Sequence, residues 1–273
     1  MIDLHEALLS KQGKVFRKCR SSKFDSDKRP IVHVNGITDE CSIAEEFAQH
    51  FAKVCTSNSK EEAARLTAKY AQMRSDYCGN LIDDSSYFDA ELVENVFSNL
   101  MKRGKAAGLD GISAEHVIFC HPLLPVVLAK LLNFMVCSGH VPASFGMSYT
   151  VLVPKNNASV YSKSLTIDDF TGISISLVLS KIFEHCILDR YCKYFVTSEN
   201  QFGFKRESSC ARAIYTLQSV VDYYINYGST VNVCSLNLSK AFDKINHHGL
   251  FIKLTERHLP NNILSILERW FVN

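Results

Sequence analysis

Residues 231–250 read VNVCSLNLSKAFDKINHHGL, and this stretch decides the expected fold class. Residues 230–236 alternate in side-chain type and are rich in β-branched residues, which predicts a β-strand. A turn and then a helix over residues 247–257 are expected to follow. The stretch therefore places Asn237 where a strand ends and the chain turns toward a helix.

Apolar residues recur at helical spacing through most of the remaining chain. Strands and helices interleave, which indicates an α+β or α/β architecture whose sheet has few strands. A second strand is expected at residues 149–155, YTVLVPK. The predicted helices cover residues 39–54, 59–75, 89–104, 122–137, 174–196, 208–227 and 261–272.

Two of these helices have distinctive compositions. Residues 122–137 are the most apolar stretch, but a membrane-spanning helix needs about 20 residues, and this stretch contains Lys130 and Asn133, so we expect a buried core helix. The helix over residues 208–227 contains Tyr215, Tyr223, Tyr224 and Tyr227. These tyrosines could stack on nucleic-acid bases. We expect them instead to pack in the core and at its rim.

Composition and charge limit the classes of protein. The 273 residues are 47% hydrophobic, which is enough for a sizeable core in one large domain or two small ones. The formal net charge is only +2, so nucleic acid would have to be bound by local basic patches. Residues 11–29 form one such patch, as a solvated linker or as an RNA-contacting arm. Its candidate contacts are Lys11, Lys14, Arg17 and Lys18.

Ten cysteines are scattered along the chain without a CxxC pair and without histidines at ligand spacing. This pattern argues against a zinc site and against a disulfide framework. No apolar run opens the sequence, so no secretory signal is expected. Reduced thiols would then fit an intracellular protein of the nucleus or the cytoplasm.

Several motifs resemble those of reverse transcriptases from non-LTR (LINE-like) retrotransposons. The run LSKAFDK at residues 238–244 is similar to the first palm motif of this family, in which an Asp stands at the position of Asn237. Segments similar to five further family elements precede it in the family's order. They are VNGITDECSIAEEFAQHFAKVC at 34–55, GKAAGLDGIS at 104–113, VLVPK at 151–155, DDFTGISISLVLSKIFE at 168–184 and QFGFKRESSC at 201–210.

The resemblance implies an α+β fold that forms part of a right-hand polymerase, with fingers and an incomplete palm. Residues 1–80 would be a basic arm and helical linker, and residues 81–273 a partial reverse transcriptase domain. The family is an RNA-directed DNA polymerase that uses an RNA template, a DNA primer, deoxynucleoside triphosphates and Mg²⁺. A membrane partner is not expected, and the oligomeric state stays open.

The resemblance also assigns candidate site residues by their positions in the motifs. Asn237 occupies the first metal-binding carboxylate position, and Phe242 the aromatic position that excludes a ribose 2′-hydroxyl. Lys155 and Thr171 would lie in the fingers near the triphosphate. The family has an Arg at position 171, which binds phosphate through two hydrogen bonds.

Three departures from the family pattern predict an inactive polymerase fragment. The amide of Asn237 has no net charge to neutralise a divalent ion, and Thr171 lacks the guanidinium. The chain also stops at Asn273, before the family's next palm motif and its Asp-Asp strand. Asp243 lies in a turn, where a capping or surface role is expected. The alternatives are a non-enzymatic RNA-binding remnant and a transposon relic without function.

Overall fold

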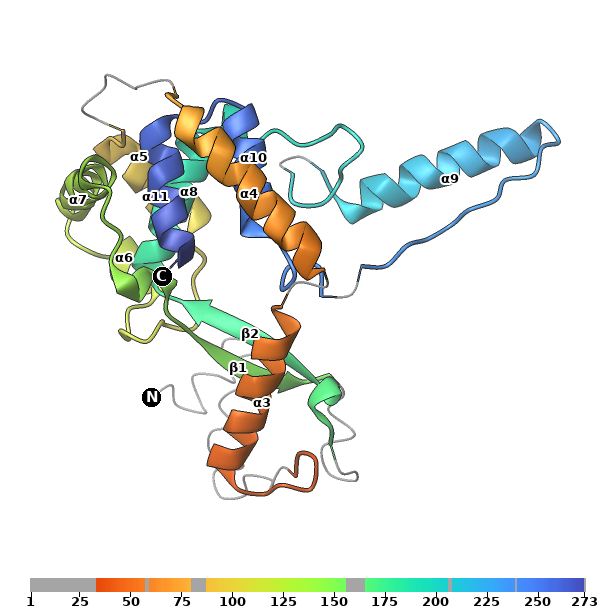
Figure 1. The fold of residues 1–273 in the computed structure, drawn as a ribbon, viewed down its shortest axis with the longest axis horizontal. Coiled ribbons are helices and arrows are strands. Elements are labelled where there is room, and N and C mark those ends of the chain that lie inside the picture. Colours follow the sequence, from red (N-terminus) through yellow and green to blue (C-terminus); the bar gives the residue numbers. More distant parts are fainter. Residues whose placement is uncertain are drawn as a thin grey trace, which may run out of the picture. The chain divides into compact units, whose positions relative to one another are not determined.

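A computed structural model describes residues 33–56, 59–79, 87–155, 165–205, 208–238 and 240–272. These residues form helices and one two-stranded antiparallel sheet, which is compatible with the expected α+β class (Figure 1). The chain divides into two compact units, Met1–Lys53 with Leu152–Ile173 and Val54–Val151 with Ser174–Asn273. The basic arm and the expected boundary near Leu81 lie outside the described residues.

The first unit is built around α3 (Glu40–Val54), which matches the predicted helix. Asp39 caps α3, because its carboxylate accepts hydrogen bonds from the Ser42 amide at 2.8 Å and the Ser42 hydroxyl at 2.7 Å. These bonds, the hydroxyl first, lower the pKa of Asp39. The buried ring of Phe47 meets Phe170 edge-to-face at a centroid distance of 5.3 Å, which gives this unit a small aromatic core.

Most helices lie in the second unit, and the long ones overlap the predicted ranges, although the helix expected at residues 174–196 is shorter and the helix at Ala114–Ile118 was not predicted. They are α4 (Lys60–Asp76), α5 (Ala90–Asn95), the π-helix η1 (Val96–Leu100), α6 (Ala114–Ile118), α7 (Leu124–Ser138), η2 (Ala143–Gly146), α8 (Val178–Arg190), η4 (Cys192–Tyr194), α9 (Cys210–Asn226), α10 (His247–Glu256) and α11 (Asn261–Val272). The strands are β1 (Ser148–Pro154), as predicted, and β2 (Phe170–Ser176), with the short helix η3 (Ile167–Asp169) before β2. The helix expected from residue 174 therefore begins later, because residues 174–176 pair with β1.

An aromatic cluster forms the centre of the second unit. Phe183 of α8 is fully buried, stacks on Trp270 of α11 at 5.2 Å and meets Phe88 edge-to-face at 5.9 Å. The Trp270 indole N–H donates to the Phe145 carbonyl oxygen at 3.3 Å, so its polar atom is satisfied beside the core. The cluster joins segments from four distant parts of the sequence.

Asn133 of α7 is a polar residue with a structural role in this core. Its side-chain oxygen accepts from the Phe88 amide at 2.8 Å, and its side-chain nitrogen donates to the Phe88 carbonyl at 2.6 Å. Both backbone groups before α5 are thus satisfied, which removes the cost of burying them. None of the helices within the described residues is long and apolar enough to cross a membrane.

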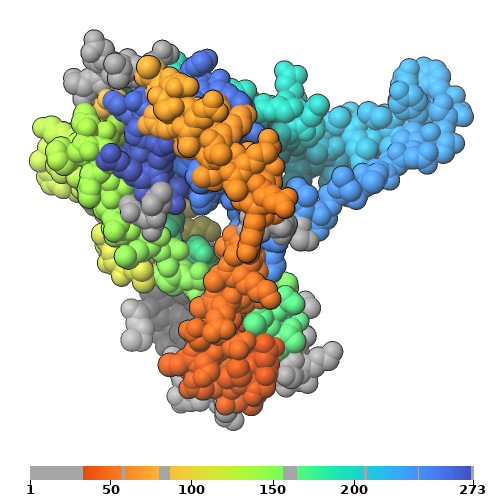
Figure 2. Space-filling view, in the orientation of Figure 1, coloured from red at the N-terminus to blue at the C-terminus, as the bar shows by residue number. Residues whose placement is uncertain are grey.

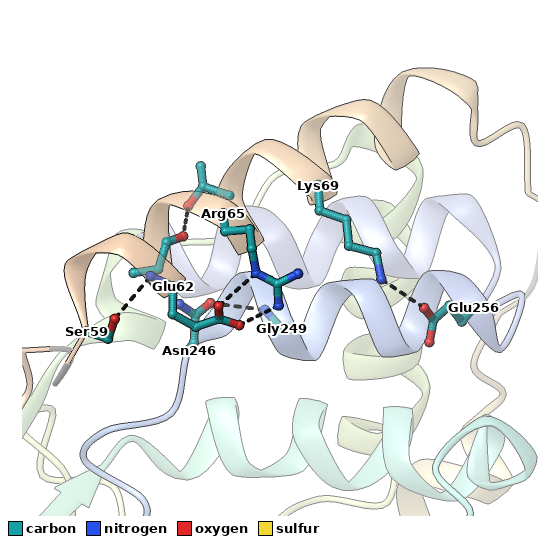
Figure 3. A network of polar contacts seen from close by, with 9 residues as sticks. Ser59, Glu62, Arg65, Lys69, Asn246, Gly249 and Glu256 are labelled. Carbon is teal, nitrogen blue, oxygen red and sulfur yellow. Dashed lines mark hydrogen bonds and ion pairs between the residues drawn. The ribbon is translucent and has the colours of Figure 1, made fainter.

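Helix α4 packs against α10, and the surfaces of the orange and blue helices adjoin in Figure 2. Ser59 caps α4 by accepting from the Glu62 amide at 3.2 Å, and Asn246 caps α10 by accepting from the Gly249 amide at 3.1 Å (Figure 3). Lys69 and Glu256 form an exposed ion pair at 3.5 Å across the two helices (Figure 3).

A less exposed polar group joins α4 to α11. Glu268 of α11 accepts a hydrogen bond from the hydroxyl of Tyr70, and it pairs with the Arg74 guanidinium at 3.0 Å. Arg74 also donates to the Ser265 hydroxyl at 2.7 Å. About a quarter of the Arg74 and Glu268 side chains is exposed, so this pair is less screened by water than the Lys69–Glu256 pair.

Two expectations were wrong. Residues 230–236 form no strand, because they have no strand partner among the described residues, where the sheet contains only β1 and β2. Helix α9 has no buried residue, so its tyrosines do not pack in the core; Tyr215 is 72% exposed and Tyr227, directly after the helix, 74%.

Helix α7 is buried on one face only, with Val127 and Phe134 on the exposed face.

The Glu268 contacts predict an unequal response to two glutamate substitutions. Glu268→Ala removes the partner of both Tyr70 and Arg74, so we expect the free energy of unfolding to fall by about 1–3 kcal/mol. Glu256→Ala removes only the exposed pair with Lys69 and should cost less than about 1 kcal/mol. Urea unfolding of both variants measures the difference, and equal losses would contradict this account.

Tyr70 also predicts a dependence of stability on pH. Burial, and then the hydrogen bond to Glu268, raise the pKa of Tyr70 above its ordinary value of 10.0. The neutral hydroxyl is therefore favoured in the folded state, and its contribution is complete below about pH 10 and lost as the pH rises toward the raised value. Between about pH 9 and about pH 11, we expect the free energy of unfolding to fall less steeply with pH in Tyr70→Phe than in the unaltered chain. Tyr223→Phe, at an exposed position, is the control, and identical slopes for all three proteins would refute the prediction.

Candidate functional site

The GLDG loop, residues 101–113, connects η1 to α6 and is held against two other motif segments. The Tyr149 hydroxyl at the start of β1 donates to the Ala107 carbonyl at 2.9 Å. Gly108 lies against Leu177, which follows β2, and a Cβ built on Gly108 would be only 3.0 Å from the Leu177 Cα. The second unit thus brings together two of the segments that resemble family motifs, residues 104–113 and 168–184, and Tyr149 from the predicted strand at residues 149–155.

Further hydrogen bonds fix the conformation of the GLDG loop. The Met101 amide donates to the Val96 carbonyl at 3.1 Å, closing the π-turn that precedes the loop. The Gly104 amide donates to Glu115 Oε1 at 2.5 Å, and the Ile112 amide donates to Asp110 Oδ1 at 3.0 Å. The bond from Gly104 is the main reason that the pKa of Glu115 is lowered. Asp110 of the loop and Glu115 of α6 therefore both accept hydrogen bonds from backbone amides of the loop.

Two phenylalanines bring the QFGF turn and the LSKAFDK run together. The rings of Phe204 and Phe242 meet edge-to-face, with a centroid distance of 5.4 Å and an interplanar angle of 81°. Both are exposed, Phe204 by 91% and Phe242 by 70%. Phe204 also has a φ of 56°, an unfavourable backbone conformation for a bulky side chain. An exposed aromatic pair on a strained turn is typical of a surface that contacts a ligand.

Asn237 lies in an irregular, exposed segment that leads from α9 toward this aromatic pair. No group of three His, Cys, Asp or Glu side chains that could hold a metal ion occurs among the described residues. The amide oxygen of Asn237 can coordinate a divalent ion, but it has no net charge to neutralise the ion and therefore binds it more weakly than a carboxylate does. The residues that the structure describes therefore do not fit the Mg²⁺ site that the resemblance implies.

Lys155 and Thr171 both lie in the first unit, Lys155 directly after β1 and Thr171 within β2. The Lys155 ammonium group donates to the Asp168 carbonyl at 2.6 Å, and the Lys155 amide donates to the Asp169 carbonyl at 2.8 Å. Thr171 is exposed on β2. The lysine thus stabilises the hairpin, and a phosphate would have to compete with the Asp168 carbonyl for its ammonium group.

An apolar groove of about 480 Å³ lies elsewhere in the second unit, on α8, α10 and α11. Trp270, Phe271 and Phe145 line it, and Glu184 is its one acidic lining residue. None of the candidate site residues lines this groove. Its lining is hydrophobic core at the surface, without the convergent polar groups that characterise an active site.

Sequence reasoning missed the two contacts that organise the site. The edge-to-face pair of Phe204 and Phe242 and the packing of Gly108 on Leu177 join residues that are far apart in the sequence. A single sequence contains no signal for such pairs. The glycine in GLDG was the nearest hint, because glycine permits close approach of another backbone.

No family model matches the chain. It is 21% identical over 145 residues to the retrovirus-related Pol polyprotein from type-2 retrotransposable element R2DM of Drosophila melanogaster. The similarity covers 53% of this chain and 13% of that polyprotein, so the chain corresponds to a small part of that relative's length. This similarity supports a retrotransposon-related origin of the chain.

The packing of Gly108 predicts a measurable effect of adding one methyl group. In Gly108→Ala the new Cβ would press on the Leu177 backbone, so we expect a loss of about 1–3 kcal/mol in unfolding free energy. Gly203→Ala is the matched control, because a Cβ there meets nothing within 4 Å and the residue has no positive φ. Thermal and urea unfolding test the pair, and equal stability of the two variants would argue against the anchoring contact.

Proposed function

We propose that this chain is a fragment of an RNA-directed DNA polymerase of a non-LTR retrotransposon and that it does not itself synthesise DNA. The observation that carries the origin is the similarity to the R2DM polyprotein over about half of the chain, 53%. The segments that resemble reverse transcriptase motifs, which occur in the family's order, support the same origin. On this proposal the described residues form part of the fingers and the beginning of the palm.

The packing of the motif segments is consistent with this origin. The GLDG loop, the start of β1 and the residue after β2 meet in the second unit, and the QFGF turn meets the LSKAFDK run through Phe204 and Phe242. Apart from Tyr149, which precedes the VLVPK segment, these residues belong to segments that resemble reverse transcriptase motifs by sequence.

Loss of catalysis follows from the chemistry of the residues at two candidate positions. Phosphoryl transfer by a polymerase depends on carboxylates that hold divalent ions beside the triphosphate and the primer. Asn237 supplies an amide at that position, and Thr171 supplies a hydroxyl where the family has a guanidinium. Each substitution weakens a different interaction with the same substrate, so their effects combine.

Primer extension tests the proposal directly. The chain is mixed with an RNA template, an annealed DNA primer, deoxynucleoside triphosphates and Mg²⁺, and the products are resolved on a denaturing gel. We expect no extension by the unaltered chain. We also expect none by Asn237→Asp, because one restored carboxylate does not complete a site for two metal ions.

The two outcomes that oppose the proposal differ in meaning. DNA synthesis by the unaltered chain would overturn the assignment of inactivity. Synthesis only by Asn237→Asp would show that this substitution alone accounts for inactivity, contrary to the expected contribution of Thr171. A reverse transcriptase of known activity in the same buffer controls for the quality of the template and primer.

A further inference from the structure

A basic and aromatic surface occurs at the start of the GLDG loop and is distinct from the candidate residues discussed above. Lys102, Arg103 and Lys105 are all exposed and lie within four consecutive positions. The Arg103 guanidinium lies over the ring of Phe119 at 4.7 Å from its centroid. Phe119 itself is 67% exposed, so most of this ring remains accessible.

The nearby acids form no ion pair with these cations among the described residues. Glu115 accepts from the Gly104 amide and Asp110 from the Ile112 amide, so both are held by the backbone of the loop. Within the described ranges no carboxylate forms an ion pair with Lys102 or Lys105. The two lysine ammonium groups therefore have no ion-pair partner in the part of the chain that the structure describes, and an anionic ligand can contact them.

The loop also holds these side chains in a fixed place. The π-turn closed by the Met101 amide ends directly before Lys102, and the Tyr149 hydroxyl holds Ala107 on the other side. A loop that is anchored at both ends loses less conformational entropy when it binds than a free basic segment does. Single π-turns of this kind are frequent at functional sites.

We propose that Lys102, Arg103, Lys105 and Phe119 form a binding site for single-stranded RNA. The cations contact backbone phosphates, and a base stacks on the Phe119–Arg103 pair. Aromatic rings and guanidinium planes both stack on unpaired bases, whereas an acidic peptide would use the cations and leave the ring without a role. The inference deepens the proposed function and rests on it for the choice of RNA as the ligand.

RNA binding by the full chain tests the site. The probe is a fluorescein-labelled, unstructured, uridine-rich RNA of about 20 nucleotides, and its anisotropy is followed at several salt concentrations. The measurements use a background in which Lys11, Lys14, Arg17 and Lys18 are changed to Ala, so that the amino-terminal arm does not mask the loop. In this background we expect Phe119→Ala to raise the Kd at least about fivefold. Lys102→Ala with Lys105→Ala should reduce the log–log salt slope by about 1.4.

Matched controls separate the site from general surface effects. Phe134→Ala removes a ring of nearly equal exposure, 66%, and Lys130→Ala removes an exposed cation; both lie on α7, outside the loop. We expect neither to change the Kd or the salt slope. Far-ultraviolet circular dichroism and thermal melting confirm that each variant is folded.

The outcomes that overturn the inference are distinct from failure of the proposed function. RNA binding that is lost with the arm, or that is unchanged in both loop variants, overturns the loop assignment and does not affect the polymerase origin. Full displacement of the RNA by polyglutamate, together with an unchanged Kd in Phe119→Ala, would assign the surface to an acidic peptide instead. DNA synthesis in the primer-extension assay would overturn the proposed inactivity while leaving the loop contacts measurable in the same samples.

Discussion

The stacking of Phe183 on Trp270 is the contact on which the rest of the second unit depends. It joins α8 to α11, and the neighbouring rings of Phe88 and Phe145 connect the start of α5 and η2 to the same point. Burial of a large aromatic side chain contributes about 1.5–3 kcal/mol, so this cluster outweighs the exposed ion pairs. The other packed helices are positioned around it.

The position of the GLDG loop follows from that cluster. Leu177 immediately precedes α8, and α8 is fixed by Phe183. Gly108 rests on Leu177 without room for a side chain, so the loop adopts the one place that this contact permits. The contact of Gly108 with Leu177 thus helps to position the loop that carries these cations, together with the hydrogen bond from the Gly104 amide to Glu115. Interior packing can position a polar surface in this way because the protein interior is close-packed and yields little.

The sequence predicted the helices well because their determinants are local. Ser59 and Asp89 accept bonds from amides three residues later, and the apolar stripes of α3 and α11 can be read from spacing alone. The strand at residues 230–236 was predicted wrongly because a strand depends on a partner, which local pattern does not reveal. The prediction that the α9 tyrosines are buried was wrong for the same reason. Amphipathic spacing identifies the apolar face of a helix, but it does not show which element, if any, covers that face. At the candidate site the sequence supplied the individual residues, whereas the meeting of Phe204 with Phe242 required the three-dimensional structure.

Chemistry and nucleic-acid contact place different demands on a chain, so the loss of one need not remove the other. Catalysis by two metal ions requires several carboxylates within a few ångströms, and on the proposed function Asn237 stands at one of these positions and weakens the whole set. Phosphate contact is a sum of separate electrostatic terms, each from a single cation such as Lys102 or Lys105. On the proposed function, a substitution at one carboxylate position therefore weakens catalysis as a whole, whereas the loss of one cation removes only the phosphate contact that this cation makes. The distribution of charge in the GLDG loop is independent of Asn237, so substitution of Asn237 leaves these cations unchanged.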